Sequence, residues 1–280
     1  MSSVRERLKN QGLGRVADQI AAASKQSVCL TAGEIGEFQS SRLGGRPNLP
    51  AEFSWPEWKG TPLAFVAQIE LSNLPPIPDV PLPQTGALFF FYEGGEQAWG
   101  FRPEDKGSSC VLYSPDSLNK HPARSFPKSS AEYPRFAGVQ LIPGPIEESL
   151  PGGEDEFLAA LELSAEERDA YWEFLEQQAE LGPGRIHRIG GNPDCIQGDP
   201  KLEAQLVSHG LYCGDPSGYQ TGKEKGLYQG ASDWALLLQV DSEDKAEMMW
   251  GDVGRIYFLT RRTDLEQRRF DSTWLVFQCC

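Results

Sequence analysis

The chain has 280 residues, 39% of them hydrophobic, which is enough to bury a substantial core in one large domain or two small ones. Its formal net charge of −14 argues against nucleic-acid binding, because a protein that neutralises phosphates needs a basic face. No apolar run approaches the roughly 18 residues of a membrane-spanning helix, and the first residues lack the apolar segment of a signal peptide. We therefore expect a cytoplasmic globular protein that does not bind membranes.

The cysteines include no C-x-x-C pair, so their spacing predicts neither a structural zinc site nor a disulfide framework. We expect reduced, mostly buried thiols, no metal and no cofactor. The cysteines are Cys29, Cys110, Cys195, Cys213, Cys279 and Cys280.

One helix is predicted over residues 3–23. Ser3 and Glu6 fit a capping box, and the apolar residues that follow recur at helical spacing, with a bend expected near Gly12 and Gly14. Residues 40–115 then contain short apolar runs separated by proline, glycine and asparagine, a pattern typical of strands joined by turns. From residue 120 to 150 the prolines allow one strand, around FAGVQLI, and otherwise predict loop.

Residues 154–181 form a predicted acidic helical insertion, in which the helix continues or restarts at a second capping box from Ser164 to Glu167. From Glu147 to Leu181 there are 12 acidic residues and 1 basic residue, a net charge of −11, which leaves −3 for the rest of the chain. A shorter helix begins at Pro200 and ends before Gly210, and strands return as WALLLQV, GRIYFLTR and TWLVFQC.

Three segments recur in order along the chain. LGG-x-P at residues 43–47 matches IGG-x-P 146 residues later, AQI at residues 67–69 matches LQV 171 residues later, and GALFF at residues 86–90 matches GRIYF 168 residues later. We therefore expect an α+β fold of two related, mostly antiparallel β-sheet halves, at about 38–146 and 183–280, fused into one body with flanking helices.

At these segments the sequence resembles the YwqG-like family of bacterial domains of unknown function. The similar segments include LGGRPNLPAEFSWP, PLAFVAQIELSNLP, HRIGGNPDCIQGD and WALLLQVDSEDKAEMMWGDVGRIYFLTRRTDL, and they cover most of the chain from about residue 40. The acidic helical region is longer than the family pattern. The resemblance implies a duplicated α+β fold and supplies no reaction, so no catalytic residue follows from it.

Features shared by both halves are most simply explained by folding, since glycine permits positive φ and a glutamine within a strand can satisfy backbone groups. Features of one half are where we look for a site. Asp199 and His187 could act as an acid–base pair, with Gln197 and Gly198 presenting backbone groups to a ligand. Alternatively, Asp199 caps the helix that begins at Pro200. Cys195 or Cys213 could act as a nucleophile assisted by His187 or His209, but no known nucleophile motif surrounds either thiol, so both are interpreted as packing residues.

A stripe of acidic side chains at intervals of three and four residues is predicted on one face of the insertion. Like charges at this spacing destabilise a helix, so one hypothesis is a docking face for a basic protein partner. The alternatives are a solvated surface, or neutralisation by Arg261, Arg262, Arg268 and Arg269. The residues expected on the opposite face are Leu161, Ala165, Trp172, Leu175 and Ala179. The stripe comprises Glu162, Glu166, Asp169, Glu173, Glu176 and Glu180.

Trp99, Trp250 and Asp252 are further candidates, because aromatic residues could line a ligand cleft between the halves, although core packing is the simpler expectation for the tryptophans. The sequence thus favours a binding module, for a basic protein or for a small ligand in that cleft. The alternative is a hydrolase or transferase that uses Asp199 and His187.

Overall fold

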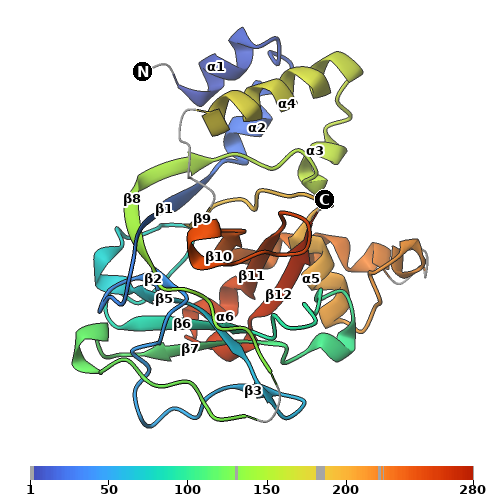
Figure 1. The fold of residues 1–280 in the computed structure, drawn as a ribbon. Helices are drawn as coiled ribbons and strands as arrows, with labels where there is room; N and C mark the ends of the chain where they lie inside the picture. Colours follow the sequence, from blue (N-terminus) through green and yellow to red (C-terminus); the bar gives the residue numbers. More distant parts are fainter. Residues whose placement is uncertain (1–2, 130–131, 181–186, 220–221, 223, 280) are drawn as a thin grey trace.

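The computed structural model describes residues 3–129, 132–180, 187–219, 222 and 224–279. Its main feature is one ten-stranded sheet in which every pairing is antiparallel, in the order β12-β11-β10-β9-β1-β8-β2-β5-β6-β7 (Figure 1). The predicted α+β class is confirmed. The strands are β1 (Lys25–Ile35), β2 (Arg42–Leu43), β5 (Ala64–Glu70), β6 (Ala87–Tyr92), β7 (Ser109–Ser114), β8 (Val139–Ser149), β9 (His187–Gly190), β10 (Trp234–Asp241), β11 (Arg255–Arg261) and β12 (Trp274–Gln278), with a separate hairpin of β3 (Glu57–Trp58) and β4 (Thr61–Pro62).

Two short helices replace the single helix predicted over residues 3–23. The Ser3–Glu6 capping box is present, but the chain turns at Gly12, whose φ is +88°, and this turn buries Leu13 and Val16 between the two helices. Glycine adopts this backbone conformation at little cost, so it interrupts the helical pattern. The helices are α1 (Val4–Asn10), α2 (Ala17–Ala22), α3 (Glu156–Ala160), α4 (Ala165–Glu180), α5 (Pro200–Ser208) and α6 (Arg262–Glu266).

The helices α1 to α4 form what we call the helical cap, at one end of the long β1–β8 pair (Figure 1). Their apolar side chains make a separate small core, which includes Leu8, Ile20, Tyr171 and Phe174. The Ser164–Glu167 capping box begins α4, with the Ser164 hydroxyl accepting the Glu167 N–H at 3.1 Å and the Glu167 carboxylate accepting the Ser164 N–H at 3.0 Å. The acidic insertion and the N-terminal helices therefore fold together.

Strand β8 runs through Pro143 and Pro145, where the sequence predicts loop. Beyond Gln140 this strand pairs only with β1, so the edge that faces β2 needs no donor at Pro143. Pro145 lies in a bulge, because Val28 pairs with Ile146 and the next pair joins Leu30 to Pro143. Both prolines thus occupy strand positions where the missing N–H costs no ladder hydrogen bond.

The central pair, β1 and β8, separates two sets of four strands. We call β2, β5, β6 and β7 the first strand set, and β9, β10, β11 and β12 the second strand set. Strand β1 pairs with β9, whereas β8 pairs with β2, so β1 lies beside the second set although the first set follows it directly in the sequence.

The two double glycines have the same backbone environment. Gly44 and Gly190 have φ of +51° and +70°; Gly44 follows β2 and Gly190 is the last residue of β9, and both of these short strands pair with the central pair. A Cβ atom at Gly44 would lie 2.2 Å from the carbonyl oxygen of Ala137, and one at Gly190 would lie 3.0 Å from that of Gln26. Only glycine combines positive φ with such a close backbone approach.

Two buried strand glutamines hold the turns that follow these glycines. The Gln68 side chain on β5 accepts the N–H of Asn48 at 2.9 Å, and the Gln239 side chain on β10 accepts the N–H of Asp194 at 2.9 Å. Both acceptors are fully buried. Each turn therefore has a backbone donor satisfied by a side chain from the neighbouring strand of its own set.

The two strand sets pack their inner faces against each other, and one core fills the space between them. Phe90 of β6 meets Phe258 of β11 with ring centroids 5.1 Å apart. The outer face of the second set is covered by α5, and that of the first set by residues 49–58 and Leu118. The ligand cleft expected between the halves is thus occupied by apolar side chains.

Candidate functional site

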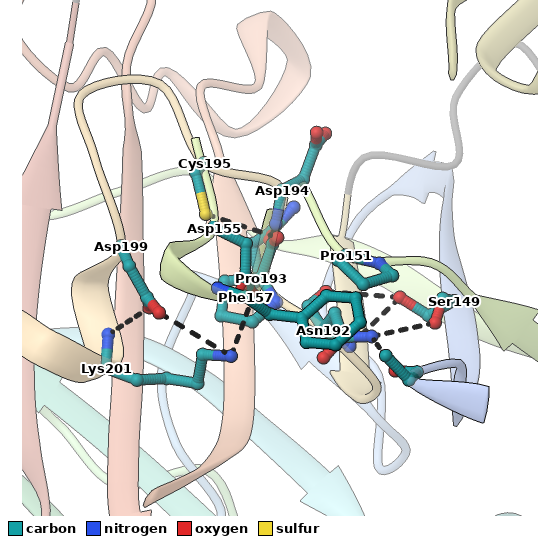
Figure 2. Close-up of polar contacts among 12 residues, drawn as sticks. Ser149, Pro151, Asp155, Phe157, Asn192, Pro193, Asp194, Cys195, Asp199 and Lys201 are labelled. Atoms are coloured by element: carbon teal, nitrogen blue, oxygen red, sulfur yellow. Dashed lines mark hydrogen bonds and ion pairs between the residues drawn. The ribbon is translucent and has the colours of Figure 1, made fainter. Parts of the chain in front are cut away.

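Asp199, the residue singled out as a candidate acid or base, caps α5. Its carboxylate accepts the backbone N–H of Lys201 at 2.8 Å, and its φ and ψ of −79° and 110° are those of a residue preceding a helix (Figure 2). Pro200 follows at the first helical position, so the capping interpretation of Asp199 is confirmed.

His187 does not assist Asp199. The imidazole is fully buried, its Nδ1 accepts the N–H of Asp241 at 3.1 Å, and its Nε2 lies 3.5 Å from the Glu243 carboxylate. Asp199 faces Lys201 instead. The acid–base pair that we expected for a hydrolase or transferase is therefore not formed, because the two side chains have separate partners on different elements.

The loop that contains Gln197 and Gly198 is held by the protein itself. The Gln278 side chain accepts the N–H groups of Ile196 and Gln197, at 2.9 and 3.1 Å, and donates to the carbonyl oxygens of Gln197 and Gly198, at 3.3 and 3.1 Å. These backbone groups satisfy Gln278 and are not directed at a ligand, contrary to the hypothesis from the sequence.

Trp250, Trp99 and Asp252 differ in their exposure to solvent. Trp250 is 1% exposed and packs on Tyr92 inside the shared core, so a ligand has no access to it. Trp99 is half-buried, with its ring centroid 4.4 Å from that of Phe277. Asp252 is exposed on the surface.

The candidate cysteine nucleophiles are buried thiols. Burial raises the pKa of Cys195 well above its ordinary value and that of Cys213 to about 12. Because the thiolate is the nucleophile, both cysteines are suited to packing.

The acidic stripe is exposed on α4 and on the turn before it. Trp172, expected on the buried face, is 39% exposed beside the stripe, and its ring covers the backbone of Gly153. Tyr171 and Phe174 are buried instead, because α4 packs on the other three helices of the cap and not on the sheet. The Glu180 side chain lies outside the described residues. The exposed members are Glu162, Glu166, Asp169, Glu173 and Glu176.

The arginines expected to neutralise the stripe have other partners. Arg261 stacks on Trp234 at 4.8 Å, Arg262 donates to the carbonyl of Asp79, and Arg269 pairs with Asp264. In the part of the chain that the structure describes, no cation forms an ion pair with the five exposed acidic side chains; Arg15 pairs with their neighbour Glu167. The neutralisation hypothesis is therefore wrong for Arg261, Arg262 and Arg269.

A cavity of about 200 Å³ lies where the helical cap meets the second strand set. Its walls come from segments far apart in the sequence. The helical cap contributes the end of α2 and the start of α3. The rest of the wall comes from the first residue of β1, the loop at residues 79–80, the turn after β9, and the starts of α5, β10 and α6. The lining residues include Lys25, Asp79, Asp155, Phe157, Asn192, Lys201, Trp234 and Arg262.

One wall of this cavity is a buried ionic cluster. The Lys201 ammonium group lies 2.8 Å from the Asp155 carboxylate and 3.7 Å from that of Asp199, and both carboxylates are 3% exposed (Figure 2). Burial, with a smaller contribution from Asp155, raises the pKa of Asp199 to about 6 despite the attraction of Lys201. Asp155 also caps α3 by accepting the N–H of Phe157 at 2.9 Å. The cluster thus joins the cap to α5.

The cavity lining also includes two further cations, Lys25 and Arg262. Within the described residues, the Lys25 ammonium group has no ion pair and no hydrogen bond. Burial, followed by repulsion from Arg262, lowers the pKa of Lys25, with Asp79 acting against both. Arg262 donates one guanidinium N–H to the carbonyl of Asp79 at 2.9 Å. A small cavity therefore contains a cation that its own protein leaves unpaired.

Two cations that repel each other in the lining of one cavity favour the binding of an anion there, because the opposite charge offsets the repulsion and the anion accepts hydrogen bonds in place of water. The apolar side chains of Phe157 and Trp234 complete the wall. Sequence reasoning missed this site, since Lys25 and Arg262 lie 237 positions apart in no shared motif; the only available signal was Lys201 beside Asp199.

The fold and cavity define an α+β protein in which a helical cap closes an ionic pocket at one side of a curled antiparallel sheet. The chain belongs to the family described as "Domain of unknown function (DUF1963)", whose model matches residues 41–279. A comparison with curated proteins finds no match. The narrower YwqG-like assignment and the bacterial origin stay predictions.

No helix in the described part of the chain combines the length and apolar character needed to cross a membrane. Across the same residues, no three His, Cys, Asp or Glu side chains converge as ligands for a metal ion.

Proposed function

We propose that this protein binds a small oxyanion-bearing molecule, with a carboxylate or phosphoryl group, in the cavity beneath the helical cap. The observation that carries the proposal is the unpaired ammonium group of Lys25, which lines that cavity together with Arg262 and is repelled by it. Lys201 also lines the cavity, but the carboxylates of Asp155 and Asp199 offset its charge. The volume suits a molecule of a few heavy atoms beyond the anionic group.

The test is a calorimetric titration of the protein with inorganic phosphate and with succinate. We expect saturable binding of at least one, and Lys25→Gln should weaken it by about 10- to 100-fold, the range for losing one charge-assisted hydrogen bond. Lys120→Gln, at an exposed lysine on another element, is the control and should leave affinity unchanged. Absence of binding to both anions, or equal affinity in the Lys25 variant, would reject the proposal.

We propose a second function, docking of a basic protein on α4, because the exposed stripe has an exposed tryptophan beside it. Trp172 follows Asp169 by three residues and precedes Glu176 by four, so all three lie on adjoining positions of the helix surface. Aromatic side chains next to complementary charge are typical of protein interfaces.

Affinity capture at low salt should recover basic proteins with the wild-type chain. Their loss at high salt, where exposed charges are screened, and after Glu166, Asp169, Glu173 and Glu176 are changed to lysine would support docking. Capture that is unchanged by the four substitutions would remove this hypothesis.

We also propose that the two strand sets derive from one duplicated unit, with the boundaries expected from the sequence. Matched φ values at the double glycines, and matched glutamine bonds to Asn48 and Asp194, support it. The proposed anion cavity borders the turn of the second set only.

A further inference from the structure

A second hollow lies on the opposite strand set, along the β3–β4 hairpin. Two adjoining depressions, of about 630 and 250 Å³, share Trp58, Lys59 and Glu96 as walls. The first continues to Glu132 and Tyr133, and the second to Trp99. We call this continuous depression the Trp58 groove.

The indole of Trp58 is held in a fixed orientation in this groove. Its Nε1 donates to the carbonyl oxygen of Lys106 at 3.3 Å, and its edge rests near Gly107. The ammonium group of Lys59 lies 3.7 Å from the centre of a Trp58 ring. A fixed aromatic face that already attracts an ammonium group is a site for alkylammonium ions.

Lys59 is a weakly held occupant of that face. It is exposed at the tip of a two-residue turn, where Lys59 and Gly60 both have positive φ, +49° and +80°. Among the described residues its ammonium group has no carboxylate within ion-pair distance. A ligand ammonium group can therefore displace it without breaking an ion pair.

The groove walls offer negative charge and few backbone donors. Glu96 and Glu132 are exposed and unpaired within the described part of the chain. The Glu93 carboxylate accepts the N–H groups of Gly95, Glu96 and Ala98, at 3.1, 2.8 and 3.1 Å, which satisfies three backbone donors of that loop. An extended peptide would need such donors, whereas a polyamine needs only acceptors and aromatic faces.

We propose that the Trp58 groove binds a linear aliphatic polyamine, with one ammonium group on the Trp58 ring in place of Lys59 and others facing Glu96 and Glu132. This site is separate from the anion cavity, and neither proposal depends on the other.

Spermine is the probe, titrated by calorimetry at low ionic strength into the intact chain. Lys59→Asn should tighten binding about two- to fivefold, because it removes the competing cation and leaves an Asn-Gly turn suited to positive φ. Trp58→Leu and Glu96→Gln should each weaken binding by at least about twofold. Glu96 and Lys59 are exposed, so these two variants test the site even if the Trp58 variant folds poorly.

A variant with Glu173→Gln and Glu176→Gln controls for non-specific attraction to the acidic helix and should bind spermine like the wild type. Three results would each overturn the proposal: no saturable binding, affinity unaffected by both Lys59→Asn and Glu96→Gln, or loss of binding in the α4 variant alone. Binding of a lysine-containing peptide but not of spermine would assign the groove to a protein segment and equally overturn it.

Discussion

Replacing Lys201 with methionine is expected to lower the free energy of unfolding by about 3 kcal/mol at pH 7, measured by urea denaturation. Methionine keeps much of the side-chain volume but leaves Asp155 and Asp199 as two buried carboxylates without a cation. An uncompensated buried charge costs several times more than a lost surface pair.

Lys120→Met is the matched control, because Lys120 lies 2.6 Å from Asp116 on the surface and its side chain is 60% exposed. We expect a loss of less than about 0.5 kcal/mol there. Adding Asp199→Asn to the Lys201 variant should restore part of the stability, since asparagine caps a helix as well as aspartate does. A Lys201→Met protein as stable as the wild type would contradict a buried ionic cluster.

The loss in the Lys201 variant should shrink as the pH falls from 7 to 5. Already in the wild type the pKa of Asp199 is about 6, above its ordinary value of 3.8 in an unfolded chain. Without the ammonium group the folded-state pKa is higher still. Between the unfolded and folded pKa values the folded state binds more protons, so acidification favours folding in this window.

Gly44→Ala is the second substitution with a large expected effect, about 3 kcal/mol of destabilisation or more. The new Cβ would lie 2.2 Å from the Ala137 carbonyl oxygen at a φ of +51°, so backbone strain and a backbone clash add. The clash falls between β2 and β8, where one set of strands meets the central pair.

Gly12→Ala measures the cost of positive φ without the cost of a backbone clash. Gly12 has a φ of +88°, but a Cβ atom added there would have nothing within 4 Å, so alanine should cost only about 1 kcal/mol. Thermal or urea unfolding measures both variants. Equal destabilisation by the two substitutions would show that the close approach at Gly44 relaxes freely.

Much of the sheet could be predicted from the sequence, since β5, β6, β10, β11 and β12 are fully or almost fully buried and read as continuous apolar runs. Strand β1 was not predicted. Only residues 27–30 of its eleven are buried, and its sequence KQSVCLTAGEI mixes polar residues with glycine. A strand that is stabilised mainly by pairing with neighbours on both sides has only a weak hydrophobic pattern in its own sequence.

The candidate site was predictable only in part. The neighbouring Pro200 predicts that Asp199 caps a helix. The sequence does not predict the charged groups around Asp199, because the Lys201 side chain turns back toward the capped end and Asp155 belongs to the helical cap. His187 was a reasonable candidate by residue type, yet its Nδ1 already accepts a hydrogen bond from the N–H of Asp241 on the adjacent strand. Pairing across a sheet decides such partners, and a single sequence does not encode that register locally.

The most direct test of the anion cavity is an NMR measurement of the Lys25 side-chain pKa, with and without saturating phosphate or succinate. Burial and Arg262 disfavour the charged amine in the free protein, and a bound anion supplies the missing opposite charge. The account predicts a pKa below the ordinary lysine value that rises when the anion is added. A Lys25 pKa that stays the same in the presence of both anions would contradict it.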